Sequence, residues 1–159
     1  MKKIAGLHVQ DIVQTYSDTL IRIAVQQTKN MSEAEDIVQE VYMTLMRQKK
    51  PFDSEEHLKA WLIKVTFNKC KDYFKSSRVK KTIPITEEMT FIAKEEQIVL
   101  PEIFQLEETE RAIVYLHYYE GYTTAEIANL LEMKGNTVGS KLRRVRMKLK
   151  TILEEGSKV

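Results

Sequence analysis

The sequence predicts an all-α protein with two small helical domains joined by a flexible linker. Apolar residues recur at spacings of three and four over most of the chain, which is typical of amphipathic helices. Five Gly and three Pro among 159 residues are few for a turn-rich β protein. This periodicity fails over residues 78–99, which is long for a loop inside one compact domain. We therefore expect a first domain over residues 1–77, a linker over 78–99 and a second domain over 100–159.

Three helices are expected in the first domain. The first runs from about His8 to Lys29. The second begins at Ser32, and Glu35 three residues later would complete a capping box. The third begins near Ser54. Its apolar pattern is interrupted between Thr66 and Lys69, which suggests a break in that helix.

Basic and aromatic residues alternate in the last part of this domain, between residues 66 and 81. Lys69, Lys71 and Lys75 lie close to aromatic rings, and Asp72 is the only acid there. Such a mixture suits single-stranded nucleic acid, because cations neutralise phosphates and rings stack on bases. The alternative is that the rings belong to the core. Helical spacing favours the core for three of them and leaves Phe67 open; the three are Trp61, Tyr73 and Phe74.

The predicted second helix carries a polar face opposite its apolar stripe. This face mixes acids, an amide and a methionine at Asp36, Gln39, Glu40 and Met43. It would suit a helical protein partner, although composition alone favours an ordinary solvated surface.

The second domain contains a predicted helix-turn-helix. A helix from near Pro101 should stop at Gly121, and Thr123 with Glu126 forms a capping box for the next helix. A tight turn with Gly135 then leads to the last helix, for which Asn136 is the expected N-cap. In this motif the second helix enters the major groove of DNA.

The phase of the last helix separates its residues into faces. The chain has seven basic residues and no acid between residues 134 and 150. At about 100° per residue, the packed face holds Val138, Leu142, Val145, Leu149 and Ile152. Ser140, Arg143 and Arg144 are best placed for base edges, whereas the remaining cations suit phosphates. The predicted duplex contacts are Asn136, Thr137, Ser140, Lys141, Arg143, Arg144, Arg146 and Lys148.

Other classes of function find little support in the sequence. His8, His57 and His117 are scattered without metal-ligand spacing, and no phosphate loop or nucleophile motif occurs. We therefore expect no catalytic residue, metal or cofactor. A single cysteine, Cys70, and the lack of a signal peptide or long apolar segment fit a cytoplasmic protein.

Three segments together resemble the extracytoplasmic-function (ECF) sigma factors, the smallest group of the sigma-70 family. They are SEAEDIVQEVYMTLMRQ, HLKAWLIKVTFNKCKDYFK and the long segment from LEETERAIVYL to VRMKLK. The run AEDIVQEV and the order of the three segments are specific to this family, whereas the helix-turn-helix alone is not.

The resemblance implies sigma-2 and sigma-4 domains that direct core RNA polymerase to promoters. Asp36, Gln39, Glu40 and Met43 would face the β′ clamp helices. The second domain would bind the β flap and read the −35 element as a duplex. Asn68 would capture a flipped base of the −10 element at a break between two helices. The −10 contacts would be Phe67, Asn68, Lys69, Lys71 and Lys75.

The resemblance also has two departures. Gly139 stands where the family commonly has Lys or Arg, and Leu106-Glu107 stands where it usually has Leu-Pro. Many relatives are held by an anti-sigma factor, which is therefore an expected partner beside polymerase and promoter DNA. The competing interpretations are a stand-alone helix-turn-helix regulator that binds duplex DNA, and a helical adaptor without a role in DNA binding.

Overall fold

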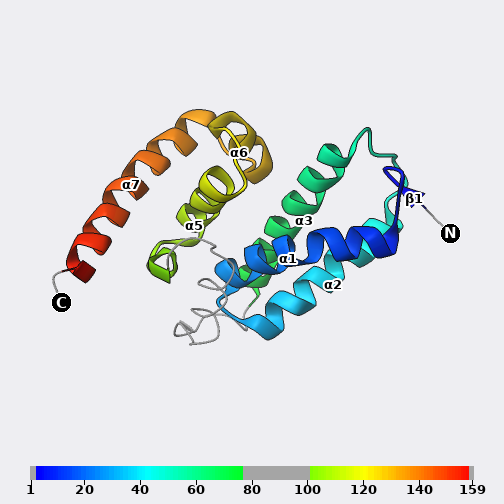
Figure 1. Cartoon of the computed structure of the whole chain (residues 1–159), viewed down its shortest axis with the longest axis horizontal. Coiled ribbons are helices and arrows are strands. Elements are labelled where there is room, and N and C mark those ends of the chain that lie inside the picture. The colour runs from blue at the N-terminus through cyan, green and yellow to red at the C-terminus, as the bar shows by residue number, and fades with distance from the viewer. Residues whose placement is uncertain (1–2, 77–100, 158–159) are drawn as a thin grey trace. The chain divides into compact units, whose positions relative to one another are not determined.

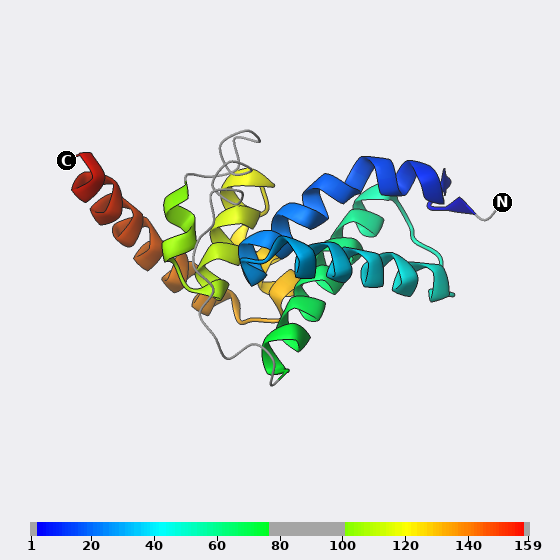
Figure 2. The same ribbon diagram turned by 90° about the horizontal axis from the view of Figure 1, so that it is seen from below.

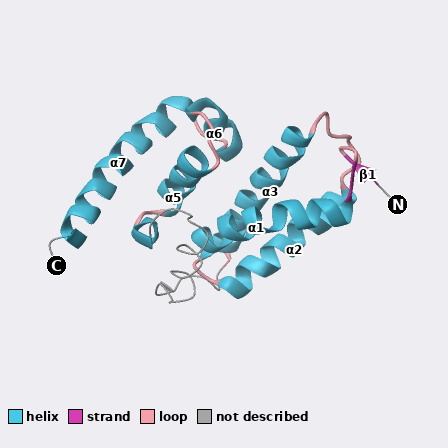
Figure 3. Cartoon of the chain, viewed as in Figure 1, coloured by secondary structure: helices cyan, strands magenta, loops and turns pink. Residues whose placement is uncertain are grey.

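The computed structural model describes residues 3–76 and 101–157, which form two helical units. The fold class is confirmed: helices account for nearly all of the regular structure (Figures 1 and 3). The predicted linker, residues 78–99, lies outside the described residues, so the exact domain boundaries stay predictions. No helix in the described part of the chain is long and apolar enough to cross a membrane.

The first unit is a three-helix bundle of α1 (Val9–Thr28), α2 (Met31–Arg47) and α3 (Glu55–Lys75). All three helices pack against one another through an apolar core (Figure 2). The Ser17 and Tyr42 hydroxyls are 2.7 Å apart and join α1 to α2 at the edge of this core.

A small hairpin precedes the bundle and was not predicted. Its strands are β1 (Lys3–Ile4) and β2 (Leu7–His8), and its two turn residues have φ of 51° at Ala5 and 80° at Gly6. Positive φ at both turn residues matches the right-handed twist of a two-residue hairpin. The buried Ile4 side chain fastens the hairpin to the bundle.

The connection between α1 and α2 corrects the predicted start of the second helix. Lys29 ends α1 with φ of 56°, and Asn30 is the N-cap of α2. The Asn30 Oδ1 atom accepts a hydrogen bond from the Glu33 amide at 3.1 Å. The predicted N-cap, Ser32, therefore lies inside the first turn, because Asn caps a helix as well as Ser does.

α3 is continuous, so the predicted break between Thr66 and Lys69 is wrong. Its N-cap is Ser54 as expected, and its buried stripe is Leu58, Leu62, Ile63, Thr66, Phe67 and Cys70. Thr66 continues this stripe because its hydroxyl donates to the Leu62 carbonyl at 2.7 Å. A polar residue whose hydroxyl is satisfied by its own helix can be buried without interrupting it.

The aromatic residues of α3 also differ from expectation. The Phe67 side chain is 3% exposed and belongs to the core. Trp61, Tyr73 and Phe74 are only half-buried. Phe52 packs edge-on against Trp61, with ring centroids 5.5 Å apart.

The described part of the second unit begins with a 3₁₀ turn η2 (Pro101–Gln105) and α5 (Glu108–Val114). The chain continues from α5 into a π-helical turn η3 (Tyr115–Tyr119) and then bends at Gly121, where φ is 78°. This positive φ confirms Gly121 as the stop of the predicted helix. The π geometry was not predicted.

The helix-turn-helix consists of α6 (Thr124–Leu131) and α7 (Gly135–Ser157). Thr123 and Glu126 form the predicted capping box of α6. The turn has its positive φ at Glu132 rather than at Gly135. α7 begins at Gly135, so Asn136 lies in its first turn and is not its N-cap. Lys134 supplies the first carbonyl, which accepts from the Val138 amide at 3.2 Å.

Candidate nucleic-acid and protein interfaces

The polar face of α2 is exposed as a continuous strip. Asp36, Gln39, Glu40 and Met43 are all exposed, and their spacing of three, one and three places them on one side of the helix. Met43 is 54% exposed. Met46 is also exposed, one turn beyond Met43. Sequence reasoning missed this second methionine because it follows the buried Leu45 directly.

The predicted −10 residues of α3 divide into buried and exposed groups. Phe67 is in the core, so its ring cannot stack on a base in this conformation. Asn68 and Lys69 are half-buried, and Lys71 and Lys75 are exposed. The Lys69 Nζ atom lies 3.9 Å from Glu40 Oε2, which links α3 to the polar face of α2.

The first turns of α7 present a packed side and an open side, as the helical phase predicted. Val138, Leu142 and Val145 are buried, whereas Leu149 and Ile152 are only half-buried. Figure 1 shows the reason, because the last turns of α7 extend beyond α5 and α6. On the open side the exposed residues are Asn136, Ser140, Arg143 and Arg144, and Thr137 and Lys141 are half-buried.

Two of the predicted duplex contacts have partners within the protein. The Lys148 Nζ atom lies 2.7 Å from Glu110 Oε2 on α5. The Arg146 Nε atom donates a hydrogen bond to the Tyr118 hydroxyl. The Arg146 guanidinium carbon also lies 5.7 Å from the centroid of the Tyr118 ring. No sequence pattern indicated Glu110 or Tyr118 as partners, because both contacts depend on how α7 packs.

The start of α5 holds two buried charged residues, Glu110 and Arg111. Burial tends to raise the pKa of Glu110. Hydrogen bonds from Lys148 and from the Glu107 amide lower it, as do the positive charges of Lys148 and Lys141. The net result is a pKa of Glu110 below its ordinary value. Burial lowers the pKa of Arg111, against the opposing effect of Glu108 and Glu110. Arg111 Nη1 donates to the Leu106 carbonyl. Glu107 is the N-cap of α5, and its amide donates to the Glu110 carboxylate at 3.1 Å.

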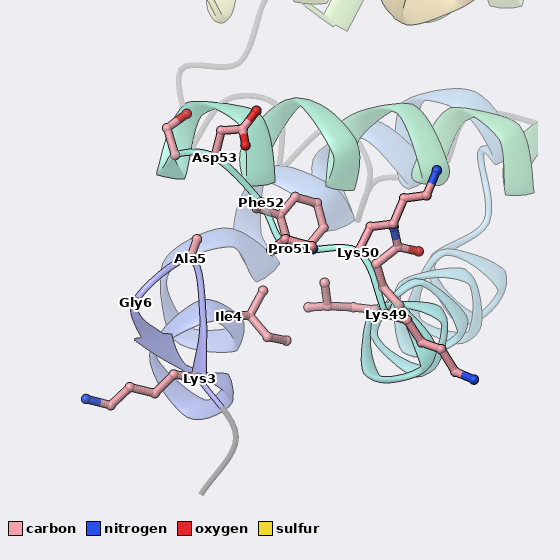
Figure 4. Close-up of a pocket in the computed structure, with 12 residues that line it drawn as sticks. Lys3, Ile4, Ala5, Gly6, Lys49, Lys50, Pro51, Phe52 and Asp53 are labelled. Carbon is pink, nitrogen blue, oxygen red and sulfur yellow. The ribbon is translucent and has the colours of Figure 1, made fainter.

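An open cavity of about 440 Å³ lies between the hairpin and the segment that joins α2 to α3 (Figure 4). Ile4 and Phe52 border this space, whereas the amino groups of Lys3, Lys49 and Lys50 point away from it. None of the predicted site residues is among those that line it. Over the described residues, no group of three His, Cys, Asp or Glu side chains could hold a metal ion.

Comparison with known families gives two matches in chain order. The sigma-70 region 2 family model matches residues 12–79, and the sigma-70 region 4 model matches residues 103–149. Together they match more than two thirds of the chain.

Individual relatives point to the same family. The ECF RNA polymerase sigma factor SigL of Mycobacterium tuberculosis is 26% identical, over 88% of this chain and 85% of the relative. The ECF RNA polymerase sigma factor SigW of Bacillus subtilis is also 26% identical, over 91% and 88%.

Solved structures share the fold. The sigma factor RpoE of Bartonella quintana, solved with the anti-sigma factor NepR, has a TM-score of 0.69 at 18% identity and covers 91% of this chain and 96% of its own. CnrH, solved with the cytosolic domain of CnrY, has a TM-score of 0.67 at 20% identity, over 92% and 88%. The chain belongs to the sigma-70 family of RNA polymerase sigma factors, within the ECF group.

Proposed function

We propose that this sigma factor uses three separate surfaces to bring core RNA polymerase to its promoters. The polar face of α2 binds the β′ clamp helices, the exposed side of α3 reads the −10 element and the open side of α7 reads the −35 element. The observation that carries this proposal is the exposed strip of Asp36, Gln39, Glu40 and Met43, a feature that a stand-alone DNA-binding regulator would not need.

The α2 strip has the composition of a protein interface. It combines two carboxylates and an amide with the exposed Met43, and the exposed Met46 lies one turn beyond it. Methionine is flexible and polarisable, so it adapts to the surface of a partner helix. The acids would meet basic groups on the clamp helices, which steers association and fixes register.

On α3 we assign the −10 contacts to Asn68, Lys69, Lys71 and Lys75. Because α3 is continuous, Asn68 would meet a flipped base from the side of a helix and not from a loop. The lysines would neutralise phosphates of the open strand. Phe67, which the sequence also suggested, is buried in the core, so we assign it no contact with DNA.

On α7 we assign base reading to Ser140, Arg143 and Arg144, with phosphate contacts on either side. Arginine can donate two parallel hydrogen bonds to guanine in the major groove. Asn136 and Thr137 in the first turn would position the helix on the backbone, where its N-terminal amides favour phosphate. The rest of the second unit would bind the β flap.

Several further assignments follow from this role. A protein that works with RNA polymerase in a bacterium acts in the cytoplasm. We propose an anti-sigma factor as a further partner. RpoE was solved with the anti-sigma factor NepR, and CnrH was solved with the cytosolic domain of CnrY. The sigma factor family is not known for enzymatic activity, and we assign no reaction or cofactor to this chain.

The test is reconstitution with core polymerase. Glu40→Lys should weaken binding to core at least tenfold, because it places a cation where the partner is basic. Glu35→Lys is the matched control: it makes the same charge change on the same helix, at the side of the strip. The proposed surface would be wrong if both variants bound core as tightly as the unchanged protein. A failure of the unchanged protein to bind core at all would leave the regulator interpretation.

A further inference from the structure

The apolar side chains of α7 are buried more deeply in its first turns than near Leu149. Val138, Leu142 and Val145 are buried, but Leu149 is only half-buried. Beyond Val145, two polar contacts hold α7 to the rest of the second unit. Arg146 contacts Tyr118, and Lys148 contacts Glu110. Arg146 and Lys148 follow Val145 by one and three positions, so they extend the attachment of α7 by about one turn.

The contact of Lys148 is a hydrogen-bonded ion pair with a nearly buried carboxylate. The side chain of Glu110 is 7% exposed and that of Lys148 is 49% exposed, with 2.7 Å between Nζ and Oε2. The other oxygen of Glu110 accepts the Glu107 amide at 3.1 Å. One carboxylate thus joins the first turn of α5 to α7. If Lys148 turned to a phosphate, it would leave a buried carboxylate without its cation, which is costly.

The contact of Arg146 depends on the π-helical turn. Tyr118 is 53% exposed, yet its hydroxyl and its ring both contact Arg146. His117 packs edge-on against Tyr118, with centroids 4.8 Å apart, and its Nδ1 lies 3.0 Å from the Tyr122 carbonyl oxygen. Tyr118 is therefore supported from behind and is placed to hold the guanidinium.

We infer that Glu110 and Tyr118 are positioning residues, which hold Lys148 and Arg146 so that α7 keeps a fixed rotation about its axis. The inference rests on the proposed reading of the −35 element by α7. Lys148 and Arg146 then stabilise the orientation of the reading residues Ser140, Arg143 and Arg144, and do not contact phosphate. The exposed Lys150, two residues beyond Lys148, has the role of a phosphate contact.

Salt dependence separates a positioning lysine from a phosphate contact. Binding of the reconstituted holoenzyme to a promoter with an intact −35 element is measured over a range of salt concentrations. Lys150→Met should reduce the slope of log K against log salt by about 0.9, as the loss of one phosphate contact does. Lys148→Met, the matched change, should leave the slope unchanged. An equal fall in slope for both variants would overturn the inference.

Rescue at Tyr118 tests the orientation itself. Tyr118→Leu removes the hydroxyl and the ring, so we expect several-fold less discrimination between a cognate and a mutated −35 element at an unchanged salt slope. Tyr118→Phe keeps the ring and should retain part of that discrimination. Unchanged discrimination in Tyr118→Leu would contradict the inference.

A measurement without DNA guards against loss of fold. Thermal unfolding of Glu110→Gln, Lys148→Met and the double variant should show coupling, with the double variant less destabilised than the sum of the single changes. Additive Tm shifts would overturn the pair as a structural contact. If the unchanged holoenzyme ignores the −35 element, the proposed function of α7 fails, and that outcome is distinct from all of these.

Discussion

Gly139 is a residue whose side chain could be enlarged without a steric clash. A Cβ atom added there would meet nothing within 4 Å, and its backbone is helical. Glycine inside a helix costs about 0.5–1 kcal/mol relative to alanine. Gly139→Ala should therefore raise the free energy of unfolding by about that amount, measured by urea denaturation. Gly121→Ala is the opposite control: φ is 78° there, so the same change should destabilise the protein.

The carboxylate of Glu110 predicts a specific dependence of stability on pH. Its pKa in the folded protein lies below its ordinary value of 4.5, so the folded state favours the ionised form. The ionised Glu110 therefore contributes its full stabilisation above pH 4.5. This contribution is lost as the pH falls through the lower pKa of the folded protein. The free energy of unfolding of the unchanged protein, measured from unfolding curves, should fall over this acidic range.

Glu110→Gln is the matched variant for this measurement, because it keeps the shape of the side chain and removes its titration. It should be less stable at neutral pH and show a shallower loss below pH 4.5. Identical pH profiles for the two proteins would show that Glu110 is not the titrating group.

At the scale of single residues, the sequence predicted which side chains of α7 are exposed and which are buried, because helical phase controls both. Ser140, Arg143 and Arg144 are exposed and Val138 is buried because one rotation of 100° per residue fixes both sets. The contacts of Arg146 and Lys148 could not be predicted in this way. They depend on where Tyr118 and Glu110 lie after the second unit has folded.

At the scale of elements, long helices were predictable and their ends were less so. α1, α2 and α6 follow the apolar pattern closely, but Asn30 replaced Ser32 as the N-cap of α2. Both residue types cap well, so composition cannot choose between them. The π-helical turn η3 has no sequence signal, and the two-residue strands of the hairpin are too short to show an alternating pattern.

The continuity of α3 gives a test at the same scale. Asn68→Pro should cost about 3 kcal/mol or more, because proline removes a hydrogen bond from the helix interior and clashes with the preceding turn. Asn68→Ala should keep the fold, since alanine favours helix. The free energy of unfolding of both variants is measured by urea denaturation. A small cost for Asn68→Pro would mean that the helix is broken there, as the sequence first suggested.

At the scale of the whole molecule, the order of the segments was more informative than any one of them. A helix-turn-helix alone fits many regulators, and a polar helix face alone fits mere solvation. The run AEDIVQEV followed by the basic helix and the helix-turn-helix fits the sigma-70 family, which the two family matches confirm. The predicted linker, residues 78–99, could be recognised in the sequence only by its lack of periodicity.

Each unit has its own apolar core, and this organisation predicts independent reading of the two promoter elements. Arg144→Ala should cost about 1–3 kcal/mol at a cognate −35 element and relax selection there. Asn68→Ala should relax selection only in the −10 element. Because Asn68 lies in the first unit and Arg144 in the second, the double variant should show the sum of the two losses.

The measurement is selection from a promoter library by reconstituted holoenzyme, followed by sequencing of the transcripts. Base preferences at the −35 positions should change in the Arg144→Ala holoenzyme while the −10 preferences stay fixed. The Asn68→Ala holoenzyme should show the reverse. An equal loss at all sequences would make Arg144 a phosphate contact. One substitution could instead change the base preferences at both promoter elements. The two units would then not read the promoter independently, because a single side chain would control how both units align with the DNA.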